Sequence, residues 1–527
     1  MSEWIDPRQL KAWLHDGQEI ALLDVREQGE YGEAHLFFGV PLPYSRLELD
    51  IARMVPRLST RLVVYDADGA GVAIKAAQRL TAMGYSQVRV LQGGTAAWQA
   101  AGHALFAGVN LPSKTFGELA EHAYATPSVS ADELAAWLAA KEDVVVLDGR
   151  PLAEFKKMSI PGATCCPNGE LAYRVRHLVP SEKTRIVINC AGRTRSIIGA
   201  QTLINLGLPN PVFALRNGTQ GWYLEDHVLE HGKTQAYGPP ADVERMQAAA
   251  SSLAARVGVQ SVSDDTVMVW AEDTTRSLFL CDVRTPEEFA QGSLPGAQHT
   301  PGGQLMQAMD LYVGVRNARL VLFDSDGVRA LTVASWLVQM GHDVHVLEKG
   351  LQSGVVLARR GAFPVPLLEP ISAADLKQQL ALNKIRVLDV RSSMQYRAAH
   401  IPGAQWSIRP VLDQALAQEN RPVVFVADDS LIAACAATEM AHVAQSYWLD
   451  GGLQAWQAAG YPVEATPDTP PDSACIDFLF FVHDRHDGNK AAARQYLAWE
   501  THLVSQLDAQ EIASFRLPQP TQLEMHP

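Results

Sequence analysis

The sequence predicts an α/β protein made of four tandem copies of one domain, each a mainly parallel sheet flanked by helices. Its 527 residues are several times the ~100–200 residues of a typical domain. Short apolar segments rich in Val, Ile and Leu alternate with helical patterns, which is typical of buried parallel strands. Related segments recur at intervals of roughly 105–135 residues, so whole domains repeat. We place the four domains and a C-terminal helical extension at residues 1–108, 109–235, 236–365, 366–465 and 466–527.

Each copy opens with a β-prone pair, a capping residue and a helical pattern. The four capping residues are Asp6, Ser130, Ser263 and Ser372. A side-chain oxygen at this position accepts hydrogen bonds from the free N–H groups of the first helical turn. We therefore expect a helix directly after each capping residue.

An apolar strand that ends in Asp-x-Arg lies 17 to 19 residues after each capping residue. In the second copy the pair is Asp148 and Arg150. The same pair recurs in the other three copies, which have no cysteine at the end of their second apolar strand. Because the pair recurs in copies that have no cysteine to react, we interpret it as a buried ion pair or capping bond that organises the fold. Glu154 lies near the same strand end and is interpreted in the same way.

A second apolar strand distinguishes the copies by its last residue. The four matched residues are Asp66, Cys190, Asp324 and Val426. Each copy then continues through an Ala-rich helical pattern and a further strand to a Gly turn, 26 to 28 residues after the matched position. Ligands of parallel sheets bind beyond the carboxyl ends of strands. Cys190 is therefore the candidate reactive residue.

The loop after Cys190 predicts an activated nucleophile. A helix is expected to begin a few residues later, so backbone N–H groups that lack a helical partner surround the cysteine. These donors and the helix dipole favour the thiolate, and Arg193 and Arg195 add positive charge. We expect the Cys190 thiol to be more acidic than a free cysteine.

The other three copies keep the loop without the thiol. Asp66 and Asp324 place a carboxylate in the same cradle of N–H groups, and Val426 places no charge there. Arg329 occupies the fifth loop position of the third copy, which leaves ligand binding open at that loop.

These features together resemble the rhodanese family of sulfurtransferases. They are Asp-x-Arg, the Ile-Pro-Gly-Ala turn, the loop that begins with Cys190 and the closing Gly-Gly-x-x-x-Trp, and the resemblance covers essentially residues 1–465. It implies the α/β rhodanese fold, transfer of sulfane sulfur, and Cys190 as the nucleophile. The residues that the resemblance assigns to the substrate-binding loop are Ala191, Gly192, Arg193, Thr194, Arg195 and Ser196.

The resemblance also implies a reaction in two displacements. The thiolate takes the outer sulfur of a small anionic donor such as thiosulfate, sulfite leaves, and a thiol or cyanide acceptor then takes the sulfur from the Cys190 persulfide. The persulfide of a small thiol such as glutathione is an equal candidate for the donor. A related phosphatase is disfavoured, because its Cys-x5-Arg loop places Arg where this chain has Ser196.

Two other functions stay open at this point. One is a scaffold or sulfur relay, in which the cysteine-free copies bind proteins and Cys190 receives sulfur from one of them. The other is an oxidative sensor in which Cys190 pairs with Cys165 or Cys166. Packing in the core is the commoner fate of a cysteine, and we expect it for Cys281 and Cys435.

Composition excludes several classes of protein. A net charge of −14 argues against a nucleic-acid surface. No apolar run approaches the ~20 residues of a membrane span and the first residues lack the pattern of a secretory signal, so we expect a cytoplasmic protein with no membrane contact. Six scattered cysteines suggest neither a disulfide framework nor structural zinc, and no cofactor is indicated. A homodimer is left open.

The C-terminal extension contains a predicted amphipathic helix. Tyr496, Trp499, Leu503 and Leu507 recur at helical spacing, so we expect this helix to dock on another domain. The charged segment 483–487, which contains two histidines, is interpreted as a solvated loop and not as a metal site.

Overall fold

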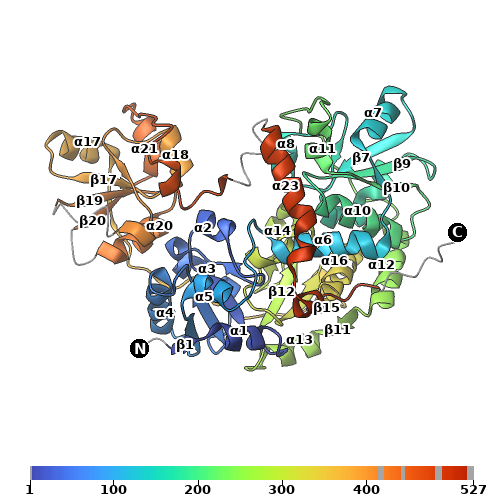
Figure 1. Cartoon of the computed structure of the whole chain (residues 1–527), viewed down its shortest axis with the longest axis horizontal. Coiled ribbons are helices and arrows are strands. Elements are labelled where there is room, and N and C mark those ends of the chain that lie inside the picture. Colours follow the sequence, from blue (N-terminus) through green and yellow to red (C-terminus); the bar gives the residue numbers. More distant parts are fainter. Residues whose placement is uncertain (1–2, 413–420, 441–444, 481–488, 519–527) are drawn as a thin grey trace. The chain divides into compact units, whose positions relative to one another are not determined.

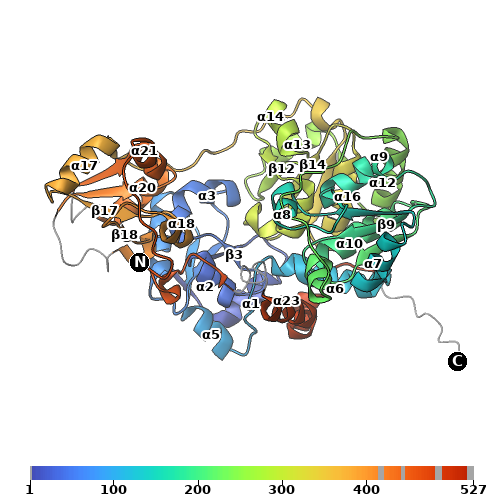
Figure 2. The same cartoon turned by 90° about the horizontal axis from the view of Figure 1, so that it is seen from above.

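Four five-stranded sheets form the framework of the chain in this computed structural model (Figures 1 and 2). The structure describes residues 3–412, 421–440, 445–480 and 489–518. Every sheet has the same order: the first strand of the copy lies at one edge, followed by the fifth, fourth, second and third strands. All pairs between neighbouring strands for which a register is defined are parallel. The predicted α/β class with four tandem copies is confirmed.

The second sheet carries the loop of interest. Its central strand is β9 (Arg185–Asn189), which lies between β7 (Val144–Asp148) and β10 (Val212–Leu215). The edge strands are β6 (Ser128–Val129) and β8 (Thr164–Cys165). The helices of this domain are α7 (Ala131–Ala139), α8 (Leu152–Lys157), α9 (Asn168–Leu178), α10 (Thr194–Asn205) and α11 (Gly218–Leu224). The loop that follows β9 therefore leaves from the middle of the sheet's carboxyl edge.

The other three copies repeat this arrangement. Their strands are β1 (Glu3–Ile5), β2 (Ala21–Asp24), β3 (Val40–Pro41), β4 (Leu62–Tyr65), β5 (Val88–Leu91), β11 (Gln260–Val262), β12 (Leu278–Asp282), β13 (Gln298–His299), β14 (Arg319–Phe323), β15 (Asp343–Leu347), β16 (Glu369–Ile371), β17 (Arg386–Asp389), β18 (Gln405–Trp406), β19 (Val423–Val426) and β20 (Ser446–Leu449). Their helices are α1 (Pro7–Leu14), α2 (Gln28–Glu33), α3 (Leu47–Met54), α4 (Val72–Ala82), α5 (Gly94–Ala100), α13 (Asp264–Ala271), α14 (Pro286–Gln291), α15 (Gly302–Gln307), α16 (Val328–Gln339), α17 (Ala373–Ala381), α18 (Ser393–Ala398), α20 (Ser430–Ala437) and α21 (Gly452–Ala458). Helices α6 (Leu111–Tyr124), α12 (Val243–Val257), α23 (Lys490–His502) and α24 (Ala509–Ile512) lie outside the repeats.

The predicted capping residues begin the first long helix of each copy. Asp6 accepts hydrogen bonds from the backbone N–H groups of Arg8 and Gln9. Ser130 forms a capping box with Glu133, in which each side chain bonds to the other's backbone N–H. Ser263 and Ser372 also accept from the first turn of their helices. The predicted helix starts are confirmed.

The Asp-x-Arg pair is a buried ion pair in all four copies. Arg150 donates to both carboxylate oxygens of Asp148, at 2.9 and 2.7 Å, and to the backbone carbonyl of Met158 at 2.7 Å. The guanidinium therefore ties the end of β7 to the end of α8. The equivalent pairs are Asp24 with Arg26, Asp282 with Arg284 and Asp389 with Arg391. The structural interpretation of this motif is confirmed.

The chain divides into two compact units. The first contains the first and fourth copies, which a buried ion pair joins: the Arg409 guanidinium contacts both oxygens of Glu48 on α3, at 2.6 and 2.9 Å. The second unit contains the second and third copies together with α6, α12 and α23. Its core is continuous, because Ile197 of α10, Leu253 of α12 and Val328 of α16 belong to one buried cluster.

Helix α23 docks within the second unit, as the sequence predicts. It packs against α6 and α11 of the same unit, and Figure 1 labels all three helices. Tyr496 and Leu503 are buried, whereas the helix ends at His502, before the predicted Leu507. Within the ranges that the structure describes, we find no helix with the length and apolar character of a membrane span.

We predict that Arg391→Met destabilises the first unit. Asp389 would remain buried without its guanidinium partner, and burial already raises the pKa of its carboxyl group. Breaking a buried pair in this way costs about 3–5 kcal/mol. Scanning calorimetry should show a lower unfolding temperature, and the double variant Asp389→Asn with Arg391→Met should recover part of the loss. An unchanged transition in Arg391→Met would contradict a stabilising role for the pair.

Candidate active site

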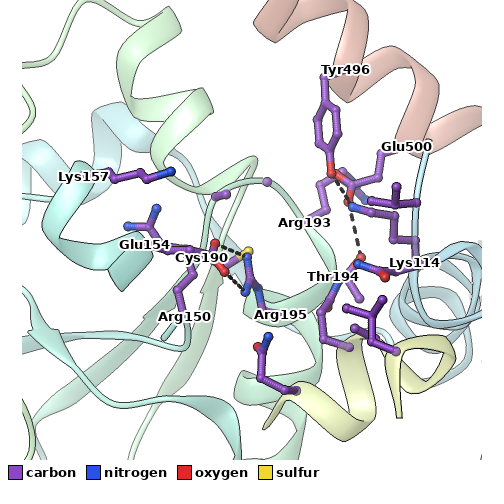
Figure 3. Close-up of a pocket in the computed structure, with 18 of the residues that line it drawn as sticks. Lys114, Arg150, Glu154, Lys157, Cys190, Arg193, Thr194, Arg195, Tyr496 and Glu500 are labelled. Carbon is purple, nitrogen blue, oxygen red and sulfur yellow. Dashed lines mark hydrogen bonds and ion pairs between the residues drawn. The ribbon is translucent and has the colours of Figure 1, made fainter. Parts of the chain in front are cut away.

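Cys190 lies at the carboxyl end of β9, immediately before the loop that starts α10 (Figure 3). Its side chain is only 2% exposed. The Ser196 hydroxyl, in the first turn of α10, donates to the Cys190 sulfur at 3.1 Å. The sulfur therefore faces the N-terminal end of a 12-residue helix, where free N–H groups and the helix dipole favour negative charge.

The closing Gly turn holds the loop in place. The backbone N–H of Thr219 donates to the Cys190 carbonyl at 2.8 Å, and that of Gln220 donates to the Ala191 carbonyl at 3.1 Å. Gly218 has a φ of +54°, and a Cβ on it would lie 2.3 Å from the Cys190 carbonyl oxygen. Only glycine permits this approach. The Gly turn thus fixes the carbonyl side of the loop and leaves the opposite side for a ligand.

The residues that match Cys190 in the first and third copies show that this loop presents backbone N–H groups. Asp324 accepts hydrogen bonds from the backbone N–H groups of Gly327, Arg329 and Ala330, at 2.6 to 3.2 Å. In the first copy, Asp66 accepts from Gly69 and Ala73 in the same manner. A carboxylate therefore fills the N–H cradle in both copies, as expected, and leaves no nucleophile there.

Arg195 lies beside Cys190 and is paired with Glu154. Its two terminal nitrogens donate to the two carboxylate oxygens of Glu154, at 2.8 and 2.7 Å. Burial lowers the pKa of Arg195, but the interactions with Glu154, Cys190 and Asp148 together raise it above its ordinary value. The sequence predicts an organising ion pair for Glu154. The pair is present, with Arg195 as the partner, and Glu154 also lines the cavity beside Cys190.

Arg193 is held by two carboxylates of α6, the helix that precedes the strands of the second copy. Its guanidinium donates to both oxygens of Glu118 on α6, at 2.8 and 2.9 Å, and to Glu121. Burial lowers the pKa of Arg193, and these carboxylates raise it well above its ordinary value. Arg193 thus forms salt bridges to both glutamates. Its predicted part in binding an anion stays a prediction.

A cavity of about 260 Å³ opens beside the Cys190 loop (Figure 3). The predicted loop residues Cys190 to Arg195 all line it. Ser196 is not in its lining and acts through its hydrogen bond to the sulfur. Sequence reasoning missed the residues that complete the wall, because they come from α6, α15 and α23, far from the repeat motif. They include Lys114, Gln304, Gln307, Tyr496 and Glu500.

A buried ion pair links the C-terminal helix to the active-site loop. Lys114 of α6 bonds to Glu500 of α23 at 2.8 Å, and both side chains are less than a tenth exposed. Lys114 also donates to the Tyr496 hydroxyl, and Thr194 donates to Glu500 at 3.4 Å. A Cβ on Gly192 would lie 2.7 Å from a Glu500 carboxylate oxygen, so the loop packs directly against α23. In the sequence, this contact is indicated only by the amphipathic pattern of the C-terminal extension.

The remaining predicted groups lie in packed surroundings. Burial raises the pKa of the Cys165 thiol to about 12 and that of Cys166 well above its ordinary value. The two thiols belong to different core clusters, which favours packing over a redox role. Arg329 is fully buried and pairs with Glu170 and Glu288, so its guanidinium organises the contact between the second and third copies. Within the described ranges, no cluster of three metal-binding side chains occurs, and the segment 483–487 lies outside those ranges.

The repeated fold and the cysteine loop define the class of the protein: it belongs to the rhodanese-like family of sulfurtransferases. The model of the rhodanese-like domain matches residues 6–101, 130–225, 268–355 and 372–459. Among solved structures, the chain is similar to a thiosulfate sulfurtransferase from Pseudomonas aeruginosa, with 42% identity, 98% of this chain and 100% of that chain covered, and a TM-score of 0.91. A rhodanese-related protein from Thermoplasma volcanium matches at 25% identity over 20% of this chain and 97% of its own, with a TM-score of 0.18.

We predict that Glu500→Leu destabilises the second unit and lowers any activity at Cys190. Lys114 would be left as a buried cation, which costs about 3–5 kcal/mol, and the wall against Gly192 would loosen. Calorimetry and a transfer assay measure the two effects. The double variant Lys114→Met with Glu500→Leu removes the uncompensated charge and should regain most of the unfolding temperature. Equal losses in the single and double variants would show that the ion pair is not the cause.

We also predict selective alkylation of Cys190 in the folded protein at pH 8. Cys165, Cys281 and Cys435 are protonated almost entirely at this pH, because burial raises the pKa of each thiol to about 12. Burial also raises the pKa of the Cys166 and Cys475 thiols. Iodoacetamide labelling followed by peptide mass spectrometry checks this. Denatured protein, in which all six cysteines should react, is the control. Labelling of Cys165 as fast as Cys190 would contradict it.

Proposed function

We propose that the chain catalyses transfer of sulfane sulfur from thiosulfate, or from the persulfide of a small thiol, through a persulfide on Cys190 to a thiol or to cyanide. The observation that carries this proposal is the position of the Cys190 sulfur: it lies at the N-terminal end of α10, beside a cavity, in a loop whose counterparts bind a carboxylate. A thiolate occupies such a place as readily as a carboxylate does, and it is in addition a nucleophile.

In the first half-reaction the Cys190 thiolate attacks the outer sulfur of thiosulfate. A new sulfur–sulfur bond forms to Cys190, the sulfur–sulfur bond of the donor breaks, and its electron pair leaves with sulfite. The outer sulfur of the persulfide carries negative charge between the two half-reactions. By analogy with the hydrogen bonds that Asp324 accepts in the third copy, the backbone N–H groups of Arg193, Arg195 and Ser196 would stabilise that charge. Arg195 adds a positive charge close to the sulfur.

In the second half-reaction the acceptor attacks the outer sulfur of the Cys190 persulfide. With a thiolate acceptor the product is a new persulfide, and with cyanide it is thiocyanate. The electron pair of the broken bond returns to Cys190, so the thiolate is regenerated and no external oxidant or reductant is needed. Because donor and acceptor react in separate steps at one residue, ping-pong kinetics are expected.

Two observations support small substrates over a protein partner. Cys190 is 2% exposed, and the cavity beside it has about 260 Å³, which suits a small anion or a small thiol better than a loop of a folded protein. Thiosulfate is favoured as the donor by the likeness to the thiosulfate sulfurtransferase of Pseudomonas aeruginosa over almost the whole chain. The sulfur relay is therefore the weaker of the two proposals for Cys190.

We predict that the purified chain forms thiocyanate from thiosulfate and cyanide, and that Cys190→Ser reduces the rate at least about a thousandfold because the hydroxyl is a poor nucleophile for sulfur. Incubation with thiosulfate alone should add the mass of one sulfur atom to the peptide that contains Cys190.

The matched control is Cys190→Asp, which copies the residue found in the first and third copies. It should keep the fold, since Asp66 and Asp324 satisfy the same loop, and it should have no activity. If wild-type protein acquires no extra sulfur from thiosulfate or from glutathione persulfide, and gains it only from a partner protein, the relay is correct and the proposed enzyme activity is not.

A further inference from the structure

The cavity beside Cys190 contains one cation that differs from the rest. Among the described residues, five basic side chains line it, and four of them form ion pairs with carboxylates. These four pairs are Lys114 with Glu500, Arg150 with Asp148, Arg193 with Glu118, and Arg195 with Glu154. The fifth is Lys157, the last residue of α8, for which the described part of the structure shows no carboxylate within ion-pair distance.

An anionic donor needs a positively charged side chain in this cavity in order to bind. The four paired cations already have their N–H groups directed at carboxylate oxygens, at 2.7 to 2.8 Å. Drawing Lys114, Arg150 or Arg193 toward a donor would leave a buried carboxylate without its partner, which is costly. Arg195 would have to give up its two hydrogen bonds to Glu154. Lys157 is exposed on α8 and lines the cavity, so its ammonium group can meet a donor at the cost only of ordering a flexible side chain.

The position of Lys157 also suits the geometry of the reaction. Figure 3 shows Lys157 and Glu154 on one side of Cys190, and Lys114, Tyr496 and Glu500 on the other. A donor whose outer sulfur meets the Cys190 sulfur has its oxyanion end directed away from the loop, into the cavity. The carboxylates Glu154 and Glu500 repel that end, whereas the ammonium group of Lys157 attracts it.

We propose that Lys157 is the donor-binding residue of this site, and that it holds the sulfonate end of thiosulfate, or the carboxylate of a thiol persulfide, while Cys190 takes the sulfane sulfur. This inference rests on the proposed sulfur transfer. The ammonium group stabilises the bound donor and also the sulfite that leaves, on which the negative charge increases as the sulfur–sulfur bond breaks. It takes no part in the second half-reaction with an uncharged acceptor.

The experiment compares two neighbouring lysines. Lys156 and Lys157 are both exposed, but only Lys157 lines the cavity, so Lys156→Met is a matched control for Lys157→Met. Initial rates are measured with thiosulfate as the donor and 2-mercaptoethanol as an uncharged acceptor. Since the kinetics are expected to be ping-pong, kcat/KM for each substrate reports its own half-reaction. Thermal unfolding confirms that each variant is folded.

For Lys157→Met we expect kcat/KM for thiosulfate to fall about tenfold, as the loss of one charge-assisted hydrogen bond implies, while kcat/KM for 2-mercaptoethanol stays within twofold. Lys157→Arg should restore most of the donor affinity, and Lys156→Met should resemble the wild type. Added salt should weaken donor binding more in the wild type than in Lys157→Met.

Three results would overturn the inference: a kcat/KM within twofold of wild type with both donors in Lys157→Met, an equal fall in Lys156→Met, or a fall in kcat/KM for the donor and the acceptor alike. Glutathione persulfide as the donor distinguishes the two anion sources, because an effect with it alone assigns Lys157 to the carboxylate. An active wild type with an unaffected Lys157→Met refutes only the role of Lys157. A wild type that transfers no sulfur from either donor refutes the proposed function itself.

Discussion

The structure of the site depends on a loop that binds one negative charge at the start of a helix. In the third copy this charge is the carboxylate of Asp324, which accepts three backbone hydrogen bonds. In the second copy Cys190 takes the same place at the end of β9, with Ser196 donating to its sulfur. In each copy the N–H groups and the helix dipole attract negative charge. The residue at the first loop position decides whether the charged group is an unreactive carboxylate or a nucleophilic thiolate.

Several parts of this arrangement were predictable from the sequence because they are local and repeated. Capping residues, the Asp-x-Arg pair and the end of the second apolar strand recur at nearly constant spacing, so comparing four copies separates what the fold needs from what Cys190 adds. Asp148 and Arg150 illustrate this, since their pair has counterparts in every copy.

The cavity wall was not predictable in the same way. Lys114, Gln304 and Glu500 lie about 76, 114 and 310 residues from Cys190 along the chain, and their places follow from domain packing, which no local pattern encodes. The ion pairs of Arg193 and Arg195 raise a related difficulty. A sequence shows that a loop has two arginines, but only the structure shows that Glu118 and Glu154 already neutralise them.

The cysteine-free third copy contributes to the site through its position. Helix α15 of that copy supplies Gln304 and Gln307 to the cavity wall, and it approaches α9 so closely that a Cβ on Gly169 would lie 2.5 Å from the backbone nitrogen of Gly303. Arg329, at the loop position that could have bound a ligand, pairs with Glu170 instead. The third copy, which has a carboxylate where the second has a thiol, thus forms one wall of its neighbour's cavity, and α6 and α23 complete the wall.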